Sequence, residues 1–209
     1  MALRLPRFYA ILDSALRPGL GVTELARTLA TAGVSLVQLR NKQATGGELW
    51  SQAQELLAAL PSTTKLIVND RADVAVLAGA AGVHLGQQDL PVAAARALLG
   101  AEKLVGLSTH SQQQVKAAAA SACDYIAFGP VFATASKDRP EPVVGCEGLR
   151  KARKLTDKPL VAIGGITPEN AAEVMGAGAD SVAVISAWLA ADDSPARLEA
   201  FRRALGRLD

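Results

Sequence analysis

The sequence is poor in the residues on which several classes of protein depend. It contains two cysteines and two histidines among 209 residues. The cysteines, Cys123 and Cys146, are too few for a disulfide framework or a zinc site. Two histidines argue against a metal centre built from several histidines. We therefore expect reduced thiols, as in a cytoplasmic protein.

The sequence also lacks a strong charge imbalance and a long apolar run. Twenty-two basic residues against 20 acidic ones give a formal net charge of +2. So small an excess does not favour nucleic acid or an anionic membrane as a partner. No apolar run reaches the length of a membrane span, and the N-terminal segment MALRLPRFYA lacks the apolar core of a signal peptide.

Short apolar runs with β-branched residues recur along the chain, and alanine- and leucine-rich segments of helical spacing lie between them. The runs lack the apolar–polar alternation of a half-exposed strand, so we expect strands buried on both faces, as in a parallel sheet. Eight such strands alternating with helices indicate an α/β fold, and the count favours a (β/α)8 TIM barrel over a doubly wound sheet. The expected strands are residues 8–12, 34–39, 65–68, 82–85, 103–107, 124–128, 159–163 and 180–185.

The chain is shorter than the roughly 250 residues typical of this barrel, so we expect short loops and a single domain over residues 1–209. Gly33 and Gly178 lie just before expected strands, and Gly82 stands at the start of one. We expect all three to end helices in the left-handed conformation that glycine adopts easily. The helices with the clearest spacing are residues 22–33 and 168–178.

Barrel enzymes carry their chemistry at the C-terminal ends of the strands, so the residues just past each apolar run are the candidates for function. Gln38, Arg40 and Lys42 share one face of the second strand, because side chains alternate with a period of two. Two cations leaving a core on one face are costly unless something negative meets them. Lys42 alone is equally well explained as a solvated residue.

Carboxylates follow the third and fourth expected strands. Asn69-Asp70 ends the third, and Asp89 comes shortly after the fourth. Neighbouring strands lie about 4.8 Å apart, so the two carboxylates could reach one hard cation. Mg²⁺ fits, because it takes one or two carboxylates and completes its shell with water and phosphate oxygens. The alternative is that Asp70, Asp73 or Asp89 caps the helix that follows.

The remaining strand ends supply histidine, hydroxyl and glycine residues. His84 lies within the fourth strand, where we expect a hydrogen-bonded residue of the barrel. The fifth strand ends in Ser108-Thr109-His110, and a histidine before a helix is usually a surface residue or a neighbour of the cap. Gly164-Gly165 and Ile185-Ser186 follow the seventh and eighth strands, where this barrel commonly binds phosphate.

The stretch FGPVFATASK, residues 128–137, ends an apolar run with Gly-Pro and then supplies Thr134, Ser136 and Lys137. These are ordinary loop residues, so a solvated turn explains them. A loop that holds an anion explains them equally, since the stretch contains no acidic residue to neutralise the lysine. The strand ends together offer cations, carboxylates, hydroxyls and a glycine pair, which favours a metal-bound diphosphate and a second phosphate as ligands.

These residues resemble, in order and spacing and over nearly the whole chain, the motifs of the thiamine-phosphate synthase family, whose thiazole tautomerase branch is the nearest relative. The motifs are Gln38-x-Arg40-x-Lys42, Asn69-Asp70, Gly86-Gln87-x-Asp89, Ser108, Gly129-Pro130-Val131-Phe132 with Thr134-x-Ser136-Lys137, Gly164-Gly165-Ile166 and Ile185-Ser186.

The resemblance implies a transferase that joins 4-amino-2-methyl-5-hydroxymethylpyrimidine diphosphate to a thiazole phosphate, or its carboxylated form, and releases diphosphate. Small molecules would be its partners, Mg²⁺ its cofactor, and a homo-oligomer is possible. The metal would be bound by Asp70 and Asp89. The pyrimidine diphosphate would be held by Gln38, Arg40, Lys42, Asn69, Ser108 and Lys137. The thiazole phosphate would be held by Thr134, Ser136, Gly165, Ile185 and Ser186. The catalytic groups would be Arg40, Lys42, Ser108 and Lys137.

The sequence departs from the family at a few positions and leaves other functions open. Ser136 stands where the family commonly has threonine, and Trp188 where it has smaller aliphatic residues. A thiazole tautomerase would use His110 as acid and base, whereas a different phosphate-binding barrel enzyme would explain only the glycine pair. A non-catalytic module would bind thiamine phosphate without making it. Asp70 and Asp89 favour the synthase, because tautomerases tend to lose this pair.

Overall fold

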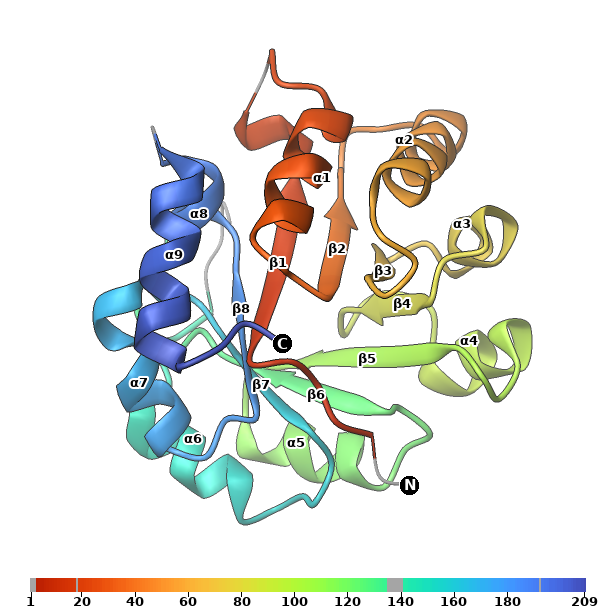
Figure 1. The fold of residues 1–209 in the computed structure, drawn as a ribbon. Coiled ribbons are helices and arrows are strands. Elements are labelled where there is room, and N and C mark those ends of the chain that lie inside the picture. The colour runs from red at the N-terminus through yellow and green to blue at the C-terminus, as the bar shows by residue number, and fades with distance from the viewer. Residues whose placement is uncertain (1–2, 18, 135–140, 192) are drawn as a thin grey trace.

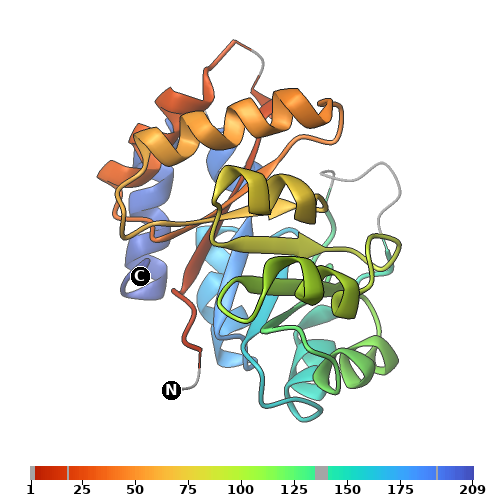
Figure 2. The ribbon, with the colours of Figure 1, turned by 90° about the vertical axis from the view of Figure 1, so that its right-hand side faces the viewer.

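Eight parallel strands close into a barrel in which each strand pairs with the next along the chain and β8 pairs with β1. The computed structural model describes residues 3–17, 19–134, 141–191 and 193–209. Helices lie outside the ring of strands (Figure 1), and the view turned by 90° shows them covering its outer surface (Figure 2). The expected (β/α)8 TIM barrel is confirmed.

The strands and helices alternate along the whole barrel. The strands are β1 (Phe8–Asp13), β2 (Leu36–Arg40), β3 (Lys65–Asn69), β4 (Gly82–Leu85), β5 (Leu104–Thr109), β6 (Tyr125–Phe128), β7 (Leu160–Ile163) and β8 (Ser181–Val184). The helices are η1 (Ser14–Leu16), α1 (Val22–Thr31), α2 (Gly46–Ala59), α3 (Ala72–Ala78), α4 (Val92–Leu99), α5 (Gln112–Ala119), α6 (Gly145–Arg153), α7 (Pro168–Gly176), α8 (Ser186–Leu189) and α9 (Ser194–Leu205). In the described part of the chain, no helix combines the length and apolarity that a membrane crossing requires.

All eight expected strands are present within two residues of their expected ends. Gly33 and Gly178 follow α1 and α7 with φ of 71° and 107°, as expected of glycines that end helices. The expectation for Gly82 is wrong. It begins β4, and Gly79 ends α3 instead, with φ of 77°. Gly82 is required by close packing, because a Cβ there would lie 2.1 Å from the carbonyl oxygen of Leu104.

Side chains alternate between the inside of the barrel and the layer beneath the helices. Tyr9 and Ile11 of β1, with Leu36 of β2, belong to a small buried cluster that fills the inside. Intervening residues such as Ala10 and Val37 join the larger core between strands and helices. Side chains alternate with a period of two, so the inward position that follows this buried cluster along a strand lies at the C-terminal end of that strand.

Trp188 anchors the short helix α8 to the barrel. It is fully buried, and its indole N–H donates to the carbonyl oxygens of Ile11 at 3.2 Å and of Val184 at 3.0 Å. The large ring thus fills the space between α8 and the β1–β8 seam. A smaller aliphatic residue would leave a cavity and lose both hydrogen bonds.

We predict that Trp188→Ala lowers the free energy of unfolding by about 3–5 kcal/mol, the usual range for removing a buried aromatic side chain. The matched control is Trp50→Ala, because the Trp50 side chain on α2 is 45% exposed. That variant should lose about 1 kcal/mol or less. Urea unfolding of both variants checks the prediction, and equal losses would contradict it.

Candidate active site

The inward positions at the C-terminal ends of the strands carry the residues predicted for the site. Gln38 lies inside the barrel with only 3% of its surface exposed, and Arg40 follows it on the same face of β2. Asn69 ends β3, and Ser108 lies near the end of β5. The barrel therefore brings together, at one rim, residues that are far apart in the sequence.

Arg40 is paired with a carboxylate that the sequence analysis missed. Asp13 ends β1 directly opposite Arg40 in the strand register, and the two side chains form an ion pair. Their side chains are 19% and 4% exposed, so the pair is largely shielded from water. The signal for Asp13 was present in FYAILD, where it lies two residues after the inward-facing Ile11.

Lys42 is paired as well. Its ammonium group lies 3.2 Å from a carboxylate oxygen of Asp70, although the lysine side chain is 58% exposed. Thus the negative charge that we expected to meet Arg40 and Lys42 is supplied by the chain itself, through Asp13 and Asp70. A ligand anion is not needed to explain either cation, which corrects the argument from the sequence.

The backbone at Asp70 adopts a left-handed conformation with φ of 62°. Aspartate and asparagine tolerate this conformation better than most residues. The Asp70 N–H donates to the carbonyl oxygen of His84 at 2.8 Å, which ties the end of β3 to β4. Such a backbone at a strand end is typical of functional sites.

The Asp70 and Asp89 carboxyl groups, which follow neighbouring strands, lie close enough to interact. Burial raises the pKa of Asp70, and the hydrogen bond with the Asp89 carboxyl group raises it further, while Lys42 opposes both effects. Asp89 also accepts from the backbone N–H of Gly86 at 2.6 Å. Neither aspartate occupies a helix N-cap, because α3 begins after Arg71 and α4 after Pro91.

The two carboxylates would suit a Mg²⁺ ion whose remaining ligands are water and phosphate oxygens. Among the described residues, no group of three or more histidine, cysteine, aspartate or glutamate side chains is placed to hold a metal by itself. Mg²⁺ does not require such a cage, because one or two carboxylates plus water and phosphate oxygens satisfy it. The pKa of Asp70 is raised mainly by burial and in smaller part by Asp89, and a cation bound there would favour the ionised form of both carboxyl groups.

A chain of hydrogen bonds crosses the inside of the barrel beneath this rim. Its distances are 2.8 Å from Gln38 to Tyr9, 3.0 Å from Tyr9 to Tyr125, 3.1 Å from Tyr125 to His84 and 2.8 Å from His84 to Ser108. The expectation that His84 is a hydrogen-bonded barrel residue is confirmed. The sequence analysis missed both tyrosines, since nothing in a lone tyrosine within an apolar run distinguishes it from ordinary core.

The loops after β6 and β7 are joined by backbone hydrogen bonds. The N–H groups of Val131 and Phe132 donate to the carbonyl oxygens of Ile163 and Gly164 at 2.9 and 3.0 Å. Gly165 permits this approach, because a Cβ there would lie 2.4 Å from the carbonyl oxygen of Ala133. The predicted residue Thr134 follows directly, so it lies next to the predicted Gly165.

The other candidate residues named from the sequence lie after β8, after β6 and after β5. Ile185 precedes α8 and Ser186 is its first residue, at the end of β8. Ser136 and Lys137 lie outside the described residues. His110 follows β5, and its Nδ1 is 2.7 Å from the carbonyl oxygen of Gly129, to which it donates.

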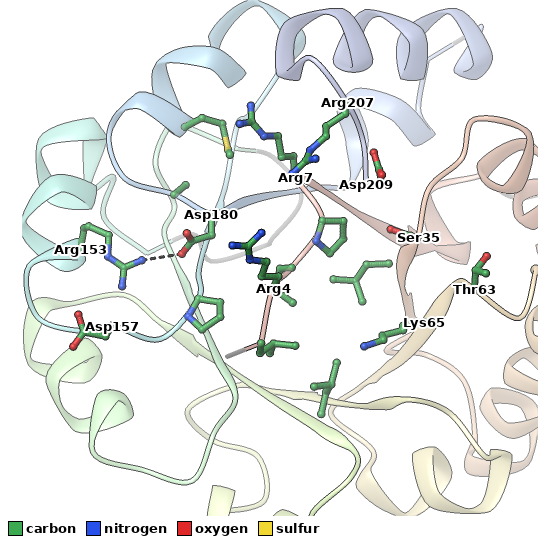
Figure 3. A pocket seen from close by; sticks show the side chains of 18 residues that line it. Arg4, Arg7, Ser35, Thr63, Lys65, Arg153, Asp157, Asp180, Arg207 and Asp209 are labelled. Carbon is green, nitrogen blue, oxygen red and sulfur yellow. Dashed lines mark hydrogen bonds and ion pairs between the residues drawn. The ribbon is translucent and has the colours of Figure 1, made fainter. Parts of the chain in front are cut away.

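A hollow of about 890 Å³ lies at the opposite, N-terminal end of the barrel (Figure 3). Arg4 and Lys65 are among its cationic residues. Arg153 donates to Asp180 at 2.8 Å and to the carbonyl oxygen of Lys158 at 2.9 Å, so it fastens the chain before β7. None of the described site residues lines this hollow. The carboxylates, cations and hydroxyls predicted for the site lie instead toward the C-terminal rim, the end at which barrels of this kind usually carry their chemistry.

The raised pKa of Asp70 predicts a dependence of stability on pH. The folded protein holds the Asp70 proton more tightly than the unfolded chain does, so ionised Asp70 disfavours folding. This penalty is absent below the ordinary carboxyl pKa and appears as the pH rises through the raised value. Asp70→Asn, which suits the left-handed backbone, should therefore gain stability relative to the wild type as the pH increases, in urea unfolding without Mg²⁺.

Asp73→Asn is the control, for which we expect the opposite dependence of stability on pH. The Arg71 guanidinium beside Asp73 lowers the pKa of this carboxyl group, so its ionised form stabilises the folded protein. The Asp73 variant should therefore be less stable than the wild type near neutral pH and approach it in acid. The same pH trend in both variants would contradict the account of Asp70.

Comparison with known proteins assigns the family. Residues 8–188 match the family model described as thiamine monophosphate synthase. The chain is 53% identical over 188 residues to the thiamine-phosphate synthase of Koribacter versatilis, covering 88% of this chain and 89% of that protein. It is 44% identical over 195 residues to the thiamine-phosphate synthase of Methanoculleus marisnigri, covering 93% and 92% of the two chains.

A solved structure agrees with the sequence comparison. Thiamine phosphate pyrophosphorylase from Pyrococcus furiosus superposes with a TM-score of 0.85 at 33% identity, covering 96% of this chain and 95% of that one. The similarity therefore extends over nearly the whole chain. The chain belongs to the thiamine monophosphate synthase family.

Proposed function

We propose that the C-terminal rim of the barrel joins 4-amino-2-methyl-5-hydroxymethylpyrimidine diphosphate to 4-methyl-5-(2-phosphoethyl)thiazole, or its carboxylated form, giving thiamine phosphate and diphosphate. Family membership supports the reaction. The observation that carries the site is the contact of Asp70 with Asp89 beside the ammonium group of Lys42. Carboxylates and cations side by side suit a diphosphate that arrives with a divalent cation.

Two groups of rim residues would each hold one substrate. Gln38, Asn69 and Ser108 lie at or near the C-terminal ends of β2, β3 and β5 and would hold the pyrimidine ring and its methylene group. Its diphosphate would be bound by Arg40, Lys42 and Lys137. The thiazole phosphate would be held after β6, β7 and β8 by Thr134, Ser136, Gly165, Ile185 and Ser186, where this barrel commonly binds phosphate.

Asp70 and Asp89 would hold Mg²⁺, which when bound neutralises charge on the diphosphate. A cation held by Asp70 would compete with the ion pair between Asp70 and Lys42. Lys42 would then be available to bind the diphosphate. Asp13 stays with Arg40 in a buried pair, so it fixes the direction of that guanidinium group.

Departure of the diphosphate leaves a carbocation-like centre on the pyrimidine methylene, and the thiazole nitrogen captures it. No protein nucleophile is required. The chain's contribution is to align the two rings and to stabilise the negative charge that grows on the leaving group. Arg40, Lys42 and Lys137 would supply that stabilisation, since a positive group gains most where charge develops.

The direct test is to mix the purified protein with both substrates and measure thiamine phosphate and diphosphate, with and without Mg²⁺. Equal amounts of both products, formed only with the metal, are expected. Binding without turnover would favour a non-catalytic module. A tautomerase would instead withstand chelation of the metal and lose its activity in His110→Ala, whereas for a synthase chelation should be the more damaging change.

We predict that Asp70→Asn combined with Asp89→Asn lowers turnover at least about 10²-fold, as expected when charge stabilisation at the leaving group is lost. A second readout does not depend on activity. Mg²⁺ with diphosphate should raise the melting temperature of the wild type by mass action and leave that of the double variant unchanged. Full activity of a folded double variant would rule out this metal site.

Lys137 and Ser136 should give different kinetic signatures. Lys137→Ala should lower kcat by about 10²–10³-fold, because its contact with the leaving group strengthens as the bond breaks. Ser136→Ala should raise KM for the thiazole phosphate and leave KM for the other substrate unchanged. Near-normal kcat for Lys137→Ala would make FATASK a solvated turn.

A further inference from the structure

The hydrogen-bonded chain inside the barrel links five strands and ends at two proposed substrate residues. Gln38 of β2 begins it and Ser108 of β5 ends it. Between them lie three buried residues that contribute no group to the proposed chemistry, Tyr9, Tyr125 and His84. We call this set the interior relay.

The direction of the interior relay follows from Gln38. Its amide nitrogen faces the Tyr9 hydroxyl at 2.8 Å, and an amide nitrogen can only donate. Within the described part of the chain, the hydroxyl group of Tyr9 makes its hydrogen bonds with Gln38 and Tyr125 alone. Because a buried hydroxyl proton needs an acceptor, Tyr9 donates to Tyr125.

The same reasoning continues to the histidine. The Tyr125 oxygen accepts from Tyr9, so its own proton is donated to Nδ1 of His84 at 3.1 Å. Nδ1 is then unprotonated, and Nε2 carries the proton and donates to the Ser108 hydroxyl oxygen at 2.8 Å. The Ser108 proton is left for an acceptor at the rim.

We propose that Tyr9, Tyr125 and His84 are positioning residues that transmit the orientation of the Gln38 amide to the Ser108 hydroxyl, so that both groups face the substrate in one fixed polarity. The opposite polarity is also self-consistent. If position 38 only accepted, every donor would reverse, His84 would carry its proton on Nδ1, and Ser108 would donate to His84 instead of the substrate.

The surroundings of the interior relay favour this role. Burial raises the pKa of both Tyr9 and Tyr125, so both hydroxyls keep their protons. The rings of His84 and Tyr125 stack with centroids 5.5 Å apart. Gly106 lies between them in the strand register, and a Cβ there would come within 2.2 Å of the Tyr125 ring. The absence of a side chain at Gly106 thus leaves room for the stacked rings of His84 and Tyr125.

The consequence for catalysis rests on the proposed function, whereas the polarity itself does not. A Ser108 proton held toward the rim can donate to a diphosphate oxygen or a ring nitrogen, and the Gln38 carbonyl oxygen can accept from an amino group. Groups oriented before the substrate binds need no reorganisation during the reaction.

The protonation of His84 can be read directly, because the chain contains only two histidines. In ligand-free protein with ¹⁵N-labelled histidine, two-bond ¹H–¹⁵N correlations distinguish the protonated from the unprotonated ring nitrogen. His110→Gln assigns the two rings. We expect His84 neutral with its proton on Nε2. A proton on Nδ1, or on both nitrogens, would overturn the proposal whether or not the protein is a synthase.

Gln38→Glu tests transmission through the relay. A carboxylate at position 38 only accepts, so the His84 proton should move to Nδ1. Tyr125→Phe removes the middle hydroxyl, and in that background Gln38→Glu should leave the His84 tautomer unchanged. A change that persists without Tyr125 would mean that charge acts through space, and the proposal would fail.

Kinetics then tests the link to the substrate. If the relay sets the Ser108 proton, Gln38→Glu already removes the donation that Ser108→Ala removes. Adding Ser108→Ala to Gln38→Glu should therefore change kcat/KM by about twofold or less, whereas independent effects would multiply. If the two substitutions multiply in their effect on kcat/KM while the His84 tautomers are as expected, the catalytic role of the interior relay is wrong. The proposed direction of its hydrogen bonds would then still hold.

Discussion

Closure of eight parallel strands into one barrel is the constraint on which every candidate functional group depends. Closure turns alternate side chains inward, and the inside must then be filled and its polar atoms satisfied. Apolar residues such as Leu36 and Ile67 fill the lower part, where Leu3 and Leu5 of the N-terminal segment pack against them. At the next inward positions along the strands, at the C-terminal rim, the side chains are polar.

Two cations at that rim are paired with carboxylates of the chain itself. Arg40 is paired with Asp13, and Lys42 with Asp70, so the folded protein does not bury an uncompensated cation there. The unfavourable element is the contact between Asp70 and Asp89, which comes together with a left-handed backbone at Asp70. A cation bound between the two carboxyl groups would relieve their repulsion.

The fold could be predicted from the sequence because its signals are local. Each β-branched run gave a strand, and the motif Gln38-x-Arg40 lay on one inward face because strands have a fixed period. Partners across the barrel could not be predicted, since Asp13 meets Arg40 only once β1 and β2 are in register. Gly82 was misassigned for the same reason: the contact that requires a glycine comes from Leu104, on the neighbouring strand. The interior relay could not be predicted from the sequence either, because its members come from five different strands.

The central claim, that chemistry occurs at the C-terminal rim, is tested most directly by a crystal structure with thiamine phosphate, diphosphate and Mg²⁺ bound. The account predicts the diphosphate and metal against Asp70 and Asp89, with the pyrimidine ring over Gln38 and Ser108. Products bound instead in the hollow near Arg4 and Lys65, with the rim empty, would contradict it.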